Sequence, residues 1–208
     1  MVKVQAPALS LEASGSLGGA MVFSKWKGRA YVRSLVKPSN PKSGGQVGVR
    51  NMFKFLAQQW QNLTPADQAS WETRADQKII SPFNAFVGFN QDRYRNFLAP
   101  ATLDPPGTLD TPATVGVTTA VAGVRSITVT MPVTTAADGW GIMVFRALAP
   151  GFATAFDNLV HVGKIDGTND VVFVDSPLTA DTYYYNFREF TEDGQLGAED
   201  GEINAVVT

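Results

Sequence analysis

Residues 178–190 read Leu-Thr-Ala-Asp-Thr-Tyr-Tyr-Tyr-Asn-Phe-Arg-Glu-Phe, and this stretch decides the fold of the second half of the chain. The turn-forming Asp181 precedes a run rich in aromatic residues, which is the composition of a β-strand. Further runs with a period of two follow residue 112, separated by Gly, Asp, Asn and Pro turn signals. The predicted strands are 115–121, 126–131, 140–146, 158–164, 171–175, 182–190 and 203–207. Their number and spacing favour a two-sheet β-sandwich.

Residues 99–111 separate this region from a differently patterned one, because they contain three prolines and a glycine. Proline fixes φ and donates no hydrogen bond, so we expect a semi-rigid linker with a domain boundary near Pro105. Before it, apolar residues recur at steps of three and four, which predicts three helices. The first covers about 46–62, and the others open at Thr64-Pro65 and Ser81-Pro82, where a hydroxyl cap precedes proline. The expected buried stripes are Val49, Met52, Phe53, Leu56, Trp60 and Leu63; Trp71, Ala75 and Ile79; and Phe83, Phe86, Val87, Tyr94 and Phe97.

The first 40 residues contain shorter signals. Residues 1–19 are small and polar, so we expect an extended arm that orders on a partner. The β-prone runs 20–23 and 30–36 flank Gly28 and predict a hairpin, which the prolines at 38 and 41 terminate. The expected fold is therefore α+β in two parts. Its domains are an arm (1–19), a basic hairpin with a helical docking domain (20–98), the linker (99–111) and an all-β sandwich (112–208).

Charge divides the chain in the same way. Residues 1–100 carry 13 Lys or Arg and 5 Asp or Glu, whereas residues 101–208 carry 4 and 14. A basic half suits docking on nucleic acid or on an acidic protein surface, and it also allows copies to stack head to tail. The alternative is that the two halves are solvated surfaces of different charge.

Catalytic and metal signals are sparse. The chain has no cysteine, and its single histidine, His161, lies in a predicted strand without a triad pattern, so we expect a structural or surface role for it. The acids after residue 165 cluster at turns but form no calcium-loop motif, and no glycine-rich segment has the setting of a phosphate loop. We expect no enzyme activity, metal or cofactor. The absence of a signal peptide and of a long apolar run predicts a soluble, unexported chain without membrane contact.

The hairpin is the strongest candidate binding site. It interleaves cations with aromatic residues, which suits phosphate contact with stacking, or anchoring in an acidic groove. The candidate partner-binding residues are Lys25, Trp26, Lys27, Arg29, Tyr31 and Arg33. The alternative is a charged edge strand that prevents aggregation. Trp60, Trp71 and Phe86 are expected in the core rather than on a ligand platform.

Two resemblances add expectations. Leu178, Thr179, Thr182 and Tyr184 match the spacing before the sixth strand of fibronectin type III domains, so the second half resembles an immunoglobulin-like sandwich of that kind. The resemblance implies that Tyr184 is the tyrosine-corner residue. It departs at Met131-Pro132, where the family's core tryptophan is missing.

The first half resembles a family of uncharacterised phage and prophage proteins. The shared features are a glycine-rich start at 15–19, Trp26-Lys27-Gly28-Arg29, Tyr31-Val32-Arg33, Asn40-Pro41 and Asn84-Ala85-Phe86-Val87. This resemblance implies a virion component in several copies, made in the host cytoplasm and bound to phage capsid or tail proteins. Parts of the helical region also resemble an HMG box in reversed order, which keeps DNA binding open.

Three functions remain. The preferred one is a virion structural protein that decorates the capsid as a cement protein or acts as a head-tail or tail adaptor. A DNA-binding virion protein is the second, because of the charge and the HMG-box likeness. A host-surface or glycan-binding adhesin, with sandwich loops near Trp140 and Phe152, is the third.

Overall fold

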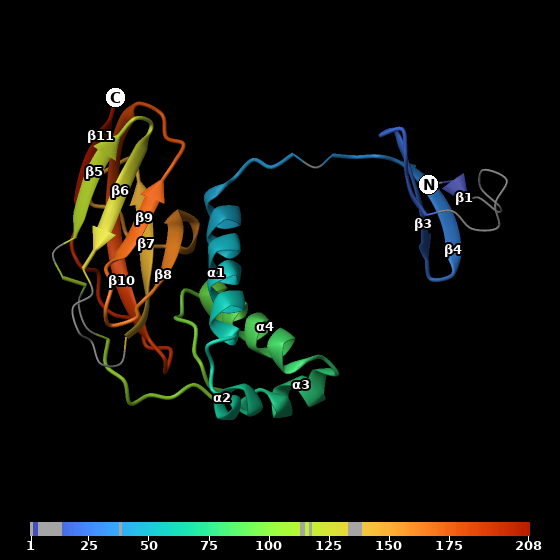
Figure 1. Ribbon diagram of the computed structural model, residues 1–208, viewed down its shortest axis with the longest axis horizontal. Helices are drawn as coiled ribbons and strands as arrows, with labels where there is room; N and C mark the ends of the chain where they lie inside the picture. The colour runs from blue at the N-terminus through green and yellow to red at the C-terminus, as the bar shows by residue number, and fades with distance from the viewer. Residues whose placement is uncertain (1, 4–13, 38, 113–114, 117, 133–138) are drawn as a thin grey trace. The chain divides into compact units, whose positions relative to one another are not determined.

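The computed structural model describes residues 2–3, 14–37, 39–112, 115–116, 118–132 and 139–208. The chain forms two compact units, Met1–Pro41 and Lys42–Thr208. Both contain antiparallel sheet, and the helices belong to the second unit (Figure 1). The chain is therefore a mixed α and β protein, as expected. Its division differs from the expected one, because the helices group with the strands that follow them and not with the hairpin.

The first unit is a four-stranded sheet, here called the N-terminal sheet, with the strand order β1-β4-β3-β2. Its strands are β1 (Val2–Lys3), β2 (Gly15–Leu17), β3 (Met21–Trp26) and β4 (Arg29–Ser34). The predicted hairpin is β3-β4, closed by Lys27 and Gly28, whose φ angles of 48° and 78° suit a two-residue turn. Residues 2–3 and 15–17 pair as strands, so the prediction of an unpaired arm is wrong there. Residues 4–13 of that arm lie outside the described residues.

The second unit, here called the C-terminal unit, begins with the helices. They are α1 (Gly44–Trp60), α2 (Pro65–Ser70), α3 (Glu72–Lys78) and α4 (Pro82–Arg95). Both predicted caps are present. At the first cap, the Thr64 hydroxyl accepts a hydrogen bond from the Asp67 backbone amide, and the Asp67 carboxylate accepts one from the Thr64 backbone amide. At the second cap, the Ser81 hydroxyl accepts a hydrogen bond from the Asn84 backbone amide. The second expected helix is divided at Trp71, which ends α2 and precedes α3.

The residues of the helical stripes are buried or half-buried, with two exceptions. Phe53 is 49% exposed, whereas Phe55 on the same helix is 3% exposed and occupies the core position that was expected for Phe53. The buried face of α1 runs through Met52, Phe55 and Leu56, and a step of two residues turns a side chain by about 200° around a helix. Ile79 is 93% exposed, because it caps α3 in the left-handed conformation and turns away from the core.

The strands of the C-terminal unit agree with those predicted, with ends shifted by a few residues. They are β5 (Thr119–Gly123), β6 (Ser126–Met131), β7 (Gly139–Ala147), β8 (Leu159–Lys164), β9 (Val171–Asp175), β10 (Asp181–Thr191) and β11 (Ile203–Val207). They form two antiparallel sheets, β5-β6-β9 and β11-β10-β7-β8. A short 3-10 helix, η2 (Phe156–Asn158), precedes β8.

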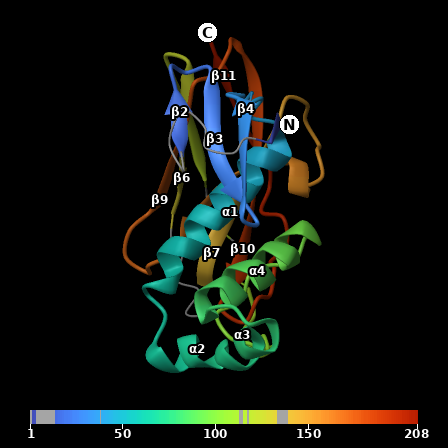
Figure 2. The ribbon, with the colours of Figure 1, turned by 90° about the vertical axis from the view of Figure 1, so that its right-hand side faces the viewer.

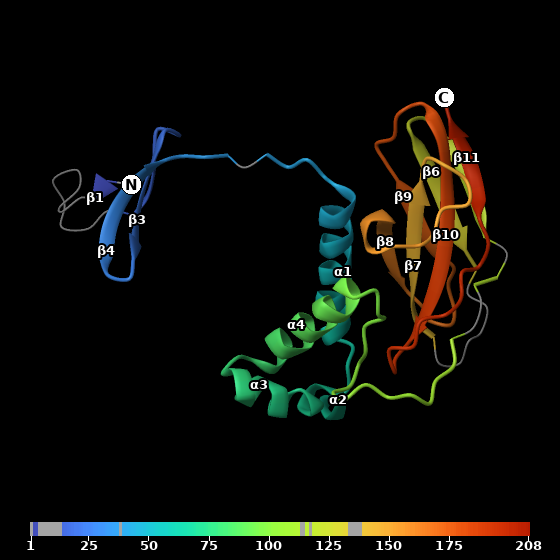
Figure 3. The same cartoon turned by 180° about the vertical axis from the view of Figure 1, so that it is seen from behind.

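The sheet β11-β10-β7-β8 contributes to two cores, one on each face. Met143 and Phe145 of β7 pack in a core shared with α1 and α4, while Ile142 and Val144 pack in a core shared with the other sheet. Successive side chains of a strand point to opposite faces, so β7 is covered on both sides. Figures 1 and 3 show the helices on one side of the two sheets, and Figure 2, seen from the helical side, shows α1 and α4 in front of them. The shared helix-sheet core explains why the helices do not form a unit with the hairpin.

Residues 99–104 are held against the helices, so the prediction of a linker is wrong for this part. The Trp71 indole donates a hydrogen bond to the Thr102 carbonyl at 2.8 Å, and the side chain of Asn90 bonds both backbone groups of Ala101 at 2.8 and 3.0 Å. Arg74 and Asp104 form an ion pair with a shortest distance of 2.6 Å. Side chains of the helices thus satisfy the backbone of a proline-rich segment that has few partners of its own.

The tyrosine that bonds back to the loop before β10 is Tyr183, which corrects the assignment to Tyr184. The Tyr183 hydroxyl donates to the Thr179 carbonyl at 3.2 Å and lies 3.1 Å from the Thr179 hydroxyl. Tyr184 is one residue further along the strand and therefore faces the other side of the sheet. Leu178 is buried and Thr182 is half-buried beside this corner.

Candidate functional site

The strand register places four of the six candidate partner-binding residues on one face of the N-terminal sheet. Trp26 lies opposite Arg29, and Tyr31 and Arg33 follow at steps of two along β4. We call these four residues the basic face. Lys25 points to the other face, opposite Ala30, and Lys27 lies in the turn.

The basic face combines strong positive charge with exposed aromatic surface. Trp26 is 66% exposed, and the Lys27 ammonium lies 4.9 Å from its ring centroid. Residues 1–41 contain six Lys or Arg and one acidic residue, Glu12. Cations with stackable rings can contact phosphate groups, carboxylates or an aromatic partner surface.

The opposite face of the N-terminal sheet is largely apolar. Met21 and Phe23 of β3 lie on it beside Ala30 and Val32 of β4. None of the residues of this unit whose side chains are described is buried. A single sheet of this size cannot offset the conformational entropy of folding without a layer packed on it. The described residues of this sheet therefore form no buried core of their own.

His161 has a packed environment. Its ring stacks on Phe173 with centroids 4.5 Å apart and planes 9° from parallel. Burial, with a smaller effect of nearby Lys54, lowers the pKa of His161 to about 4, so the ring is neutral at pH 7. This environment suits a structural role.

The turn acids have local roles where the structure describes them. Asp166 accepts hydrogen bonds from Thr168 and Asn169, and these bonds lower its pKa to about 2. Within the described ranges, no three His, Cys, Asp or Glu side chains are grouped closely enough to hold an ion. None of the helices in this part of the chain is long and apolar enough to cross a membrane.

The two aromatic residues named for glycan binding pack against the helix-sheet core. Trp140 is buried between Phe55 and Phe190, with ring centroids 5.1 and 5.8 Å away, and Phe152 is half-buried against the same core. Neither ring is a free platform for a sugar. Trp60 is half-buried, and Trp71 and Phe86 are fully buried, so the core prediction for the last two is confirmed.

The comparisons with known proteins supply no relative. No protein-family model matches the chain, and no curated protein does. Among solved structures, the spore cortex lytic enzyme SleM of Clostridium perfringens matches at 14% identity and a TM-score of 0.33, with 46% of this chain and 28% of that chain covered. The PKD domain of an M14-like peptidase from Thermoplasmatales archaeon SCGC AB-540-F20 matches at 14% identity and a TM-score of 0.30, with 47% of this chain and 97% of that chain covered.

Proposed function

We propose that this chain is a structural protein of a bacteriophage virion, and that it attaches to the capsid, the connector or the tail through its N-terminal sheet. The observation that carries the proposal is the composition of the two faces of that sheet together with its lack of a core. It has a cationic aromatic face, an apolar face and no buried residue among those described. A surface of this kind supports attachment to a partner rather than catalysis, because the missing core is completed by the bound protein.

The phage setting comes from the resemblance of residues 15–97 to phage and prophage proteins. Many copies on one particle multiply a modest affinity per copy, so a small docking sheet is sufficient for stable attachment. The C-terminal unit then projects from the attachment point. We place the protein among capsid-decorating or cement proteins first and among head-tail or tail adaptors second.

We also infer that the two sheets of the C-terminal unit form an immunoglobulin-like sandwich of the fibronectin type III kind. The strand orders β5-β6-β9 and β11-β10-β7-β8 support this inference, because they fit two sheets joined by crossing connections. The hydroxyl of Tyr183 bonded to Thr179 at the start of β10 supports it further. The helices packed on the outer face of one sheet are an addition to that plan.

The test is incorporation into particles. Particles produced from the phage genome that encodes the chain should contain it in many copies by quantitative mass spectrometry. A variant with Trp26→Ala and Arg29→Glu should be incorporated at least tenfold less, since both changes lie on the basic face. Lys78→Glu is the matched control, because Lys78 is an exposed cation on α3 and should leave incorporation unchanged.

Circular dichroism of both variants must show the wild-type helix content, so that loss of the fold does not imitate loss of attachment. Absence of the wild-type protein from purified particles contradicts the proposal. Equal incorporation of the basic-face variant and the control contradicts attachment through this face.

Nucleic acid is the second candidate partner, favoured by the spacing of Trp26, Tyr31, Arg29 and Arg33 on one face. The helices offer it little support, because their aromatic stripe packs against the sheet. Binding to single-stranded or duplex DNA that falls steeply with salt would favour this function. Salt-insensitive or undetectable DNA binding would leave a protein partner.

A further inference from the structure

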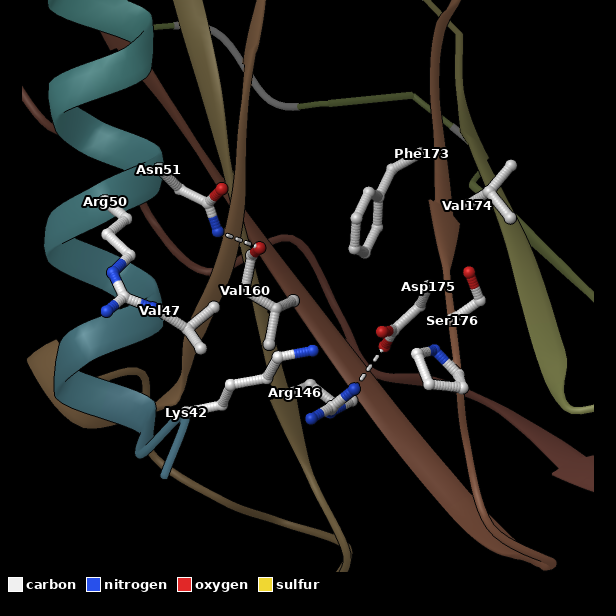
Figure 4. Close-up of a pocket in the computed structure, with 11 residues that line it drawn as sticks. Lys42, Val47, Arg50, Asn51, Arg146, Val160, Phe173, Val174, Asp175 and Ser176 are labelled. Carbon is white, nitrogen blue, oxygen red and sulfur yellow. Dashed lines mark hydrogen bonds and ion pairs between the residues drawn. The ribbon is translucent and has the colours of Figure 1, made fainter. Parts of the chain in front are cut away.

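The C-terminal unit contains a cleft of about 480 Å³ between the first half of α1 and the end of the two sheets. Figure 4 shows side chains of α1, β7, β8 and β9 around it. Its volume is in the range of sites that bind small ligands or short peptide segments. Val47, Val160, Phe173 and Pro177 give it apolar walls.

One wall is an edge strand that has a single pairing partner among the described strands. β8 and β9 are the end strands of their sheets. The edge of β8 is covered by α1, and the side-chain amide of Asn51 donates a hydrogen bond to the Val160 carbonyl. β9 pairs with β6 alone among the described strands, and its residues Phe173, Val174 and Asp175 line the cleft. An edge strand with unpaired backbone groups is a template for one more strand.

The charges in the cleft favour an anion. Lys42, Arg50 and Arg146 line it together with a single carboxylate, that of Asp175. That carboxylate is already compensated, because it accepts hydrogen bonds from Arg146 at 2.6 Å and from the Tyr185 hydroxyl at 2.9 Å. Burial and the Asp175 charge raise the pKa of Tyr185, so its hydroxyl keeps the proton that it donates.

Lys42 has no ion pair with any described residue, and Figure 4 shows its side chain extending toward that of Arg146. Residues 42–208 contain 11 basic and 18 acidic residues. A group of cations within an acidic unit focuses a local positive potential on the cleft.

We propose that this cleft binds an extended acidic peptide segment of a partner protein. The segment adds to β9 as a strand, its carboxylate lies between Lys42 and Arg146, and its apolar side chains contact Phe173 and Pro177. The open strand favours a peptide over a small carboxylate, since backbone pairing supplies affinity that a small molecule lacks. This site lies in the C-terminal unit and is independent of attachment through the N-terminal sheet.

The experiment is an NMR titration of the full chain with a blocked synthetic peptide of three Thr-Val-Glu repeats. We expect amide shifts to concentrate at Lys42 and residues 171–176 and to weaken as salt is raised. Lys42→Glu should raise the dissociation constant at least tenfold, and Lys42→Arg should restore binding to within about threefold, because it keeps the charge. Lys78→Glu, a charge reversal in the same unit away from the cleft, should change it less than twofold.

Two further ligands separate the parts of the proposal. The same peptide with glutamine in place of glutamate should bind at least tenfold more weakly, and equal binding overturns the requirement for a carboxylate. Butyrate, which has a carboxylate and a short apolar tail but no peptide backbone, should cause much smaller shifts. Equal affinity for butyrate makes this a small-carboxylate site and overturns strand addition, and an absence of shifts with the acidic peptide overturns the site.

Discussion

Phe55 joins the helices to the sheet, and its removal should destabilise both together. Its ring is edge-on to Trp140 at 5.1 Å and to Phe190 at 5.5 Å, and its side chain is 3% exposed. Truncation of a buried phenylalanine to alanine costs about 3–5 kcal/mol, which includes the lost transfer free energy and the remaining cavity. The side chain is lost together with two aromatic contacts, so we expect Phe55→Ala to lower the free energy of unfolding by about 4 kcal/mol, the middle of this range.

Urea unfolding of the full chain, followed by tryptophan fluorescence and by far-ultraviolet circular dichroism, measures this loss. With a denaturant dependence of about 2 kcal/mol per molar urea, the midpoint should fall by about 2 M. Both probes should move together, because the helices and the sheet share one core. Phe53→Ala is the matched control: the same residue type lies two positions away on α1, is 49% exposed, and should change stability by about 0.5 kcal/mol or less.

Two results would refute this reasoning. Similar losses for Phe53→Ala and Phe55→Ala would mean that the buried face of α1 is assigned incorrectly. A Phe55→Ala variant in which the helical signal melts at low urea while the sheet keeps its wild-type midpoint would mean that the helices are a separate layer.

Three further predictions test other parts of the C-terminal unit. Asn90→Ala leaves both buried backbone groups of Ala101 without their side-chain partner. Urea unfolding should therefore show a free energy of unfolding that is lower by about 2–4 kcal/mol. A change near zero would mean that Asn90 does not hold residues 99–104 against the helices. Tyr183→Phe should cost about 1–1.5 kcal/mol while Tyr184→Phe costs about 0.5 or less, and the reverse order would restore the expected assignment. The pKa of His161 is about 4 in the folded state and about 6.5 in the unfolded state. Between these pH values the unfolded chain binds more protons than the folded chain. The free energy of unfolding should therefore fall by up to about 3 kcal/mol as pH is lowered from about 6.5 to about 4. His161→Gln should lose this part of the pH dependence, and an unchanged slope would contradict the pKa assignment.

The strands and the helix caps were predictable because their signals are local. Thr64 and Ser81 indicate helix starts within four residues. The alternation of apolar and polar residues, bounded by turn residues, locates each strand. The basic face is also readable, since residues at steps of two on a hairpin share a face. Lys25 was expected to bind a partner together with that group, but it lies one residue before Trp26 on β3 and therefore points to the other face.

The buried face of α1 was not predictable from periodicity alone. Phe53 and Phe55 are both apolar, and the choice between them depends on strands about 90 residues later in the chain. One sequence feature does indicate the double coverage of β7: Trp140 to Phe145 is an almost unbroken apolar run, which is typical of a strand covered on both faces. The cleft had no comparable sign, because Lys42 and Arg146 meet only through the fold.

The double coverage of β7 has a consequence for how such a chain can diverge. If a descendant lost residues 44–95, Met143 and Phe145 would form an exposed apolar patch. Aggregation would follow unless several neighbouring positions changed at once. Recombination that transplants the two sheets without their helices is therefore disfavoured. The helices and the sheets are therefore expected to be inherited as one block.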